Sequence, residues 1–301
     1  MGSTFTNMKK LYLILLGLCT MLTACNSEQA DAPKDHPLSS ESSIYEQITA
    51  TYLQKQQNLP TKTPLGFWGW LKRVGSADAK AVAAYTIKHG LKSDWKEALL
   101  VGAAASIENA VIGGNSKRSG LTAVETKPYL SMVLPDIQQI KIAEFQRNSM
   151  DDLGYYHYTI VNEVLKDSTL SALSISDLTA TIYDKVYQQA HILGLDVSYK
   201  KEEAIAALNS INQLQDDESE TYYNQLYAFP NTENSAYFKP IIKLYTNAFF
   251  AINHVALFTA YSKEMESAVL ADTTLPQQVK DVLLLEMATY RFGNMYYFST
   301  P

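Results

Sequence analysis

The sequence predicts an all-α protein, a multi-helix bundle of about nine or ten helices that packs as one body or as two helical subdomains. Apolar residues recur at helical spacing along most of the chain, as Ile44, Ile48 and Tyr52 do at i, i+4 and i+8. Glycines such as Gly90 and Gly194 stand where these runs end, as expected of helix C-caps. No segment alternates convincingly at the two-residue period of a strand.

Residues 1–24 have the pattern of a signal peptide. Lys9 and Lys10 precede an apolar run over residues 11–22. This run has the length of a secretory signal and is too short to be a permanent membrane-spanning helix. It ends in Leu22-Thr23-Ala24-Cys25, which resembles the lipobox of bacterial lipoproteins.

The lipobox resemblance implies that Cys25 becomes the first residue of the mature chain and is lipidated. Its thiol would receive a diacylglyceryl group and its amine an acyl chain, and two or more chains are what stable membrane anchoring requires. Two other interpretations stay open. The start Met1-Gly2 fits the loose N-myristoylation pattern, and ordinary cleavage after Ala24 would leave Cys25 as a free thiol.

Residues 25–43 are expected to be a lipidated cysteine followed by a flexible tether, because they are rich in Ser, Pro and acid and have no periodicity. Asn26 follows the cysteine where an aspartate would favour inner-membrane retention. The chain is therefore expected in the cell envelope, anchored by lipid to the outer membrane on its periplasmic or surface-exposed face.

Residues 44–301 are expected to form the helical domain, with a subdivision, if there is one, near residues 113–126. The Gly113-Gly114 pair and a polar loop mark that boundary. The expected helices cover residues 44–58, 67–89, 93–112, 128–148 with a kink at Pro135, 152–166, 176–193, 199–214, 218–229, 240–270 and 277 to near the C-terminus.

The charge of the chain argues against some partners. Cleavage after residue 24 removes two of the 25 basic side chains and none of the 31 acidic ones, so the formal net charge changes from −6 to −8. An acidic chain without a basic cluster is a poor partner for nucleic acid. Cys19 leaves with the signal peptide, so the mature chain contains no cysteine pair and its stability must come from its core.

The densest polar and aromatic cluster lies in the segment from Asp152 to Tyr158, which also contains Tyr155, Tyr156 and His157. Asp152 precedes His157 by five residues and lies off its helical face, so the local sequence does not supply a carboxylate to orient this imidazole as a general base. The cluster is a candidate site or a structural histidine lined by aromatic residues.

A second candidate group is Asp184, Tyr187 and His191, which share one helical face. It is either a hydrogen-bonded functional row or the edge of the core. None of the five histidines stands in a metal-binding spacing, and no cofactor-binding motif is found, so neither a metal nor a cofactor is expected.

Tyrosine is unusually frequent, with 20 residues against 10 phenylalanines. Tyrosines of this kind line helix seams with their hydroxyls at the surface, or form a face that binds a protein or a glycan. A row of small residues, Gly102, Ser106 and Ala110, indicates close helix packing and leaves self-association open.

Three stretches resemble an uncharacterised group of helical lipoproteins and secreted proteins of Bacteroidota. They are residues 68–84, residues 153–165 with Leu-Gly-Tyr-Tyr-His-Tyr, and residues 279–297. The resemblance implies no activity. The leading hypothesis is an envelope-tethered, non-enzymatic protein that binds an unknown protein or glycan. The alternatives are an envelope enzyme, hydrolase-like, with its site around His157 or His191, and a self-associating or immunity-type lipoprotein.

Overall fold

The computed structural model describes residues 43–59, 65–90, 95–112, 148–214 and 219–298, with only the backbone for residues 65–74, 175–176, 255 and 294–298. The signal peptide at residues 1–24, Cys25 and all but the last residue of the tether lie outside these ranges. So do the boundary at residues 113–126 and the kinked helix expected over residues 128–148. These predictions therefore stay predictions.

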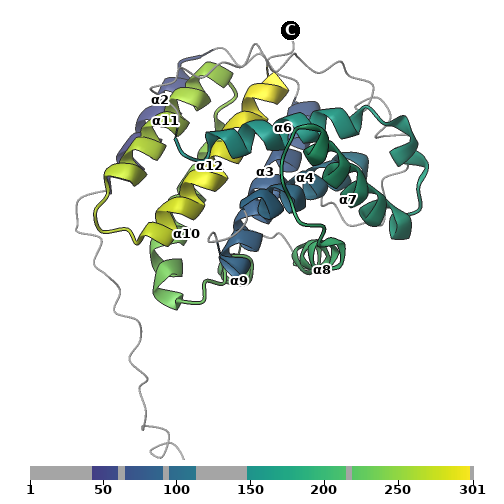
Figure 1. Cartoon of the computed structure of the whole chain (residues 1–301). Helices are drawn as coiled ribbons and strands as arrows, with labels where there is room; N and C mark the ends of the chain where they lie inside the picture. The colour runs from purple at the N-terminus through teal and green to yellow at the C-terminus, as the bar shows by residue number, and fades with distance from the viewer. Residues whose placement is uncertain (1–42, 60–64, 91–94, 113–147, 215–218, 299–301) are drawn as a thin grey trace, which may run out of the picture. The chain divides into compact units, whose positions relative to one another are not determined.

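The described part of the chain is all-α and contains ten α-helices, one short 3-10 helix and no strand (Figure 1), which confirms the predicted fold class. The α-helices are α2 (Ile44–Gln57), α3 (Leu65–His89), α4 (Trp95–Ile112), α6 (Asp151–Leu165), α7 (Ile175–Ile192), α8 (Lys201–Asn212), α9 (Glu220–Leu226), α10 (Thr232–Ala251), α11 (Val255–Ala271) and α12 (Gln277–Phe298), and the 3-10 helix is η3 (Ser168–Ala172).

Several helix ends follow directly from local sequence. Helix α2 begins with a capping box, in which the Ser43 hydroxyl accepts from the Glu46 N–H and the Glu46 carboxylate accepts from the Ser43 N–H. Gly90 after α3 and Gly194 after α7 adopt φ values of 80° and 75°. Glycine is the residue that adopts this left-handed conformation at little cost, which is why these two positions end their helices.

The prediction of a single long helix over residues 240–270 is wrong. Helix α10 begins at Thr232, carries Pro240 inside it, and ends before an extended break of three residues. The N–H of Asn253 donates to the side-chain carbonyl of Gln56, and Nδ1 of His254 accepts from the Leu257 N–H as the cap of α11. Side-chain hydrogen bonds thus satisfy backbone groups that a continuous helix would have used.

Helix α4 is the centre of one half of the core. Its residues from Glu97 to Val111 are all buried, and it packs against α3, α6, α7 and α8. This part of the core combines apolar residues of those helices with Leu285 of α12. A second hydrophobic cluster joins α2, α3, α9, α10, α11 and α12. Helices α3 and α12 contribute to both clusters and pack against each other (Figure 1).

Two glycines allow close approach between helices in this core. A Cβ on Gly102 of α4 would lie 2.1 Å from Cγ2 of Val82 on α3. A Cβ on Gly154 of α6 would lie 2.5 Å from Cδ2 of Phe292 on α12. The small-residue row of α4 is thus used at Gly102 for packing within the chain.

Residues 42–301 form a compact unit of their own. Both hydrophobic clusters lie between Tyr45 and Tyr290. Since this unit contains its own core, we expect it to fold without residues 1–25. Among the described helices, none combines the length and the apolar character needed to cross a bilayer.

Candidate functional site

The structure divides the first predicted cluster between two sides of α6. His157 and Tyr158 are buried in the bundle, whereas Asp152 and Tyr155 are exposed and Tyr156 is partly buried. Tyr155 and Tyr156 form an edge-to-face pair with centroids 5.6 Å apart. The five residues therefore do not line a common site, because consecutive positions of a helix point in different directions.

His157 meets a carboxyl group that the local sequence did not supply. Nε2 of His157 lies 3.8 Å from Oδ2 of Asp78 on α3, and the imidazole also forms a hydrogen bond with the backbone of Gly102 on α4. Ser106 on α4 lies beside Asp78, but its hydroxyl, Oδ1 of Asp78 and Nε2 of His157 have no hydrogen-bond partner among the described residues. Three helices thus meet at one buried polar pair.

Burial decides the charge of this pair. It lowers the pKa of His157 to about 4, against the smaller raising effect of the Gly102 hydrogen bond. Burial also raises the pKa of Asp78 well above its usual range, despite the nearby Ser106 hydroxyl. At neutral pH the imidazole is therefore neutral, and burial favours the protonated form of the carboxyl group beside it. Only 4% of the His157 side chain is exposed, so solvent has almost no access to either group.

The second predicted group is brought together, and two further residues join it. The rings of Tyr187 and His191 are 4.6 Å apart and edge-to-face. Tyr199, from the loop after α7, packs edge-to-face on Tyr187 at 4.8 Å. The Tyr199 hydroxyl and Nζ of Lys201 each donate to Asp184 at 2.6 Å. We call these five residues the α7 patch.

The acid–base pair of the α7 patch is held in a defined state. Burial raises the pKa of Asp184, but the hydrogen bonds and charge of Lys201, with the Tyr199 hydroxyl, outweigh it, so this pKa stays below its usual value. The hydrogen bond to Asp184 raises the pKa of Tyr199. At neutral pH the patch thus carries a carboxylate at Asp184, a neutral phenol at Tyr199 and an ammonium group at Lys201, whose pKa is raised by Asp184.

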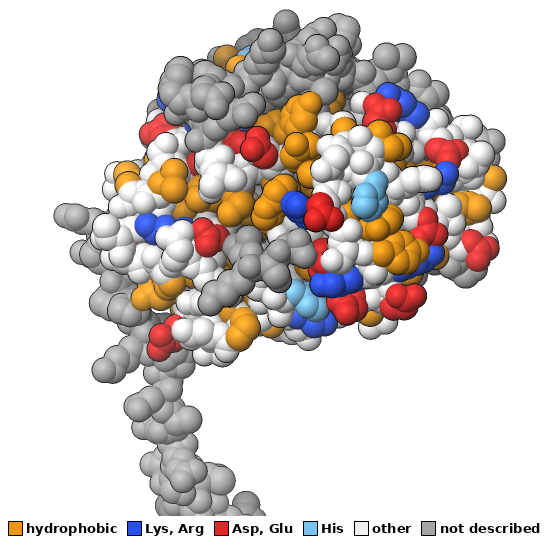
Figure 2. Space-filling view, in the orientation of Figure 1, with side chains coloured by type: hydrophobic (Ala, Val, Ile, Leu, Met, Phe, Trp, Pro, Cys, Tyr) orange, Lys and Arg blue, Asp and Glu red, His pale blue; other side chains and the backbone are white. Residues whose placement is uncertain are grey.

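The α7 patch faces solvent. Tyr199 is 51% exposed. His191 and Asp184 are also exposed, whereas Tyr187 and Lys201 are partly buried. Figure 2 shows one face of the molecule, on which acidic and basic side chains of the described residues are interspersed with hydrophobic ones.

Comparison with protein-family models, with curated proteins and with solved structures gives no match.

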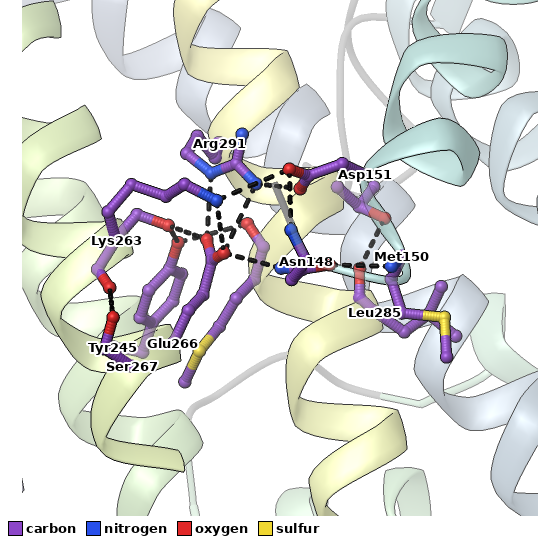
Figure 3. A network of polar contacts seen from close by, with 12 residues as sticks. Asn148, Met150, Asp151, Tyr245, Lys263, Glu266, Ser267, Leu285 and Arg291 are labelled. Atoms are coloured by element: carbon purple, nitrogen blue, oxygen red, sulfur yellow. Dashed lines mark hydrogen bonds and ion pairs between the residues drawn. The ribbon is translucent and has the colours of Figure 1, made fainter. Parts of the chain in front are cut away.

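Sequence reasoning missed a buried ionic network between α6, α11 and α12 (Figure 3). The guanidinium group of Arg291 lies between Asp151 and Glu266 and donates to both carboxylates. Nζ of Lys263 donates to the same two acids, and the Asn148 amide donates to Glu266. Asp151 and Arg291 are 140 residues apart in sequence, so no local pattern could have joined them.

Most described tyrosines lie in the core rather than on a face. Eleven are buried: Tyr45, Tyr52, Tyr85, Tyr158, Tyr183, Tyr222, Tyr223, Tyr227, Tyr245, Tyr261 and Tyr290. They line helix seams as one interpretation predicted, but several hydroxyls donate to acidic side chains instead of reaching the surface. Tyr45 bonds to Asp272, Tyr85 to Glu97, and Tyr227 to the fully buried Glu286.

Within the described ranges, no group of three or more His, Cys, Asp or Glu side chains could hold a metal ion. The α7 patch brings exposed and partly exposed groups of different chemistry together. They are suited to contact a ligand through aromatic surface, one carboxylate and one ammonium group.

Proposed function

We propose that this chain is an envelope-tethered bacterial lipoprotein that acts as a non-catalytic binding protein and contacts a partner protein through the α7 patch. The observation that carries the proposal is the ring cluster of the partly buried Tyr187 with the exposed His191 and Tyr199. Tyrosine is enriched in protein interfaces and among the residues that contribute most of their binding energy.

The patch also has the polar groups that an interface needs for specificity. Asp184 and Lys201 offer a fixed pair of opposite charges at its edge. The edge-to-face packing of Tyr187 between His191 and Tyr199 holds these rings in place, so little side-chain entropy is lost when a partner binds.

The surroundings of His157 and His191 support a catalytic role less well than a binding role. His157 has a carboxyl group beside it but is buried with it. His191 is exposed, but the nearest acid of its own helical face, Asp184, already accepts from Tyr199 and Lys201. A general base must reach a substrate proton, and neither imidazole combines access with an available carboxylate.

The anchoring part of the proposal is tested at Cys25. Cys25→Ser in the full chain, expressed in a bacterial host with the lipoprotein pathway, is expected to abolish incorporation of radiolabelled fatty acid. The protein should also leave the membrane fraction. Unchanged labelling of the variant would refute lipidation at this sulfur.

The binding part is tested with residues 26–301 immobilised on beads. The double variant His191→Ser/Tyr199→Ser is compared with Leu270→Ser, which removes an exposed apolar side chain from α11. A specific envelope protein should be retained by the wild type and by Leu270→Ser. Its affinity, measured with the purified partner, should fall about thirtyfold for the double variant.

Two outcomes would overturn the binding proposal. One is a partner that binds the double variant as well as the wild type. The other is binding of a glycan from a panel through the patch, without binding of any envelope protein. That result would show that the partner is not a protein.

A further inference from the structure

A groove separate from the α7 patch lies between the C-terminal end of α3, helix α8 and helix α9. It has a volume of about 310 Å³. This is within the range of small-molecule sites, about 300–1,000 Å³. None of the residues that line it belongs to the α7 patch.

The lining of the groove is mostly apolar. Ile87, Ile211, Leu214 and Leu226 contribute to it, together with three alanines and the ring of Tyr85. The Tyr85 hydroxyl donates to Glu97, so the polar end of this residue is already bonded. A hydrocarbon body is therefore the kind of ligand that the walls favour.

One charge distinguishes this groove from a plain apolar depression. Among the described residues that line it, Lys88 is the one that carries a charge, beside the polar Ser210 and Gln225. Lys88 is exposed, and among the described residues it has no hydrogen-bond or ion-pair partner. An apolar wall with a single ammonium group is complementary to an apolar molecule that carries one negative charge.

We propose that this groove binds a long-chain fatty acid, with its hydrocarbon chain between α8, α9 and the end of α3 and its carboxylate at Lys88. The carboxylate accepts hydrogen bonds from Nζ of Lys88, and the chain displaces water from the partly exposed Ile211 and Leu214. The proposal does not depend on a protein partner at the α7 patch.

The test is isothermal titration of residues 26–301 with decanoate, dodecanoate and tetradecanoate below their micelle concentrations. Affinity should rise about fourfold for each added methylene until the groove is filled. The methyl esters should bind more weakly than the acids, because they carry no charge for Lys88.

Variants separate the groove from nonspecific adsorption. Lys88→Met should weaken binding of the acids about three- to tenfold and leave binding of the methyl esters unchanged. Ser210→Trp, at an exposed position of the groove, should abolish binding of both. Ser267→Trp, at an exposed position of α11 outside the groove, should leave binding intact. Circular dichroism of each variant establishes that it is folded.

Three results would overturn the proposal. These are no binding of any of the acids, equal binding by folded Ser210→Trp, and an alkylammonium ion that binds as well as the acid of the same length. The last result would show that the charge preference is absent or reversed.

Discussion

Replacing Arg291 by methionine is expected to destabilise the protein by about 3–5 kcal/mol, the usual cost of removing one partner from a buried ion pair. The Arg291 side chain is 0% exposed and lies between two almost fully buried acids. The network contains two bases and two acids. Without Arg291, Lys263 alone, with 16% of its side chain exposed, faces both carboxylates.

The stability lost in Arg291→Met should depend on the negative charge of Glu266, which the variant keeps. Burial raises the pKa of Glu266, but the charge and hydrogen bonds of Arg291, with help from Lys263 and Ser262, hold it below its usual value. Without Arg291, Lys263 is the one cation of this network that faces its two buried carboxylates, so one negative charge is not compensated. The double variant Arg291→Met/Glu266→Gln removes that negative charge and should therefore be more stable than Arg291→Met alone.

Urea denaturation of residues 26–301, followed by far-ultraviolet circular dichroism, measures these differences. Arg291→Lys is the matched control, since it keeps the charge and loses the planar fork, and it should fall between wild type and Arg291→Met. The reasoning would be refuted if Arg291→Met cost less than 1 kcal/mol, or if the double variant were less stable than the single one.

Two further predictions concern buried positions. Burial raises the pKa of Glu286 from 4.5 to about 8, so between these pH values the folded state keeps a proton that the unfolded state releases. The free energy of unfolding should therefore fall by up to about 1.4 kcal/mol for each pH unit as the pH rises through this range. Urea titrations across that range should show this slope in wild type and its loss in Glu286→Gln; an unchanged slope would contradict the assignment. Gly102→Ala and Gly154→Ala each place a methyl group against a neighbouring helix, at Val82 or Phe292, and should cost about 1–3 kcal/mol despite the better helix propensity of alanine. Thermal melts check this, and a variant as stable as wild type would show that the helices separate easily.

The sequence predicted the parts of the fold that local chemistry decides. The start of α2 at Ile44 follows from its Ser43 cap, and the ends of α3 and α7 follow from Gly90 and Gly194. The break between α10 and α11 was missed because its hydrogen bonds come partly from Gln56, 197 residues away from Asn253. Helical periodicity carries no information about such a distant partner.

The same distinction holds for the candidate sites. The contact between Tyr187 and His191 spans one helical turn and was predictable from their spacing. The pair of His157 and Asp78 was not, because it joins different helices.

The pairing of α3 with α12 has a consequence for biosynthesis. Helix α12 packs against α3, so an emerging chain cannot complete the core formed by the described helices until α12 has been translated. A premature stop codon ahead of α12 would expose an apolar seam to chaperones and proteases. Such alleles should behave as complete losses of the protein rather than as mild truncations.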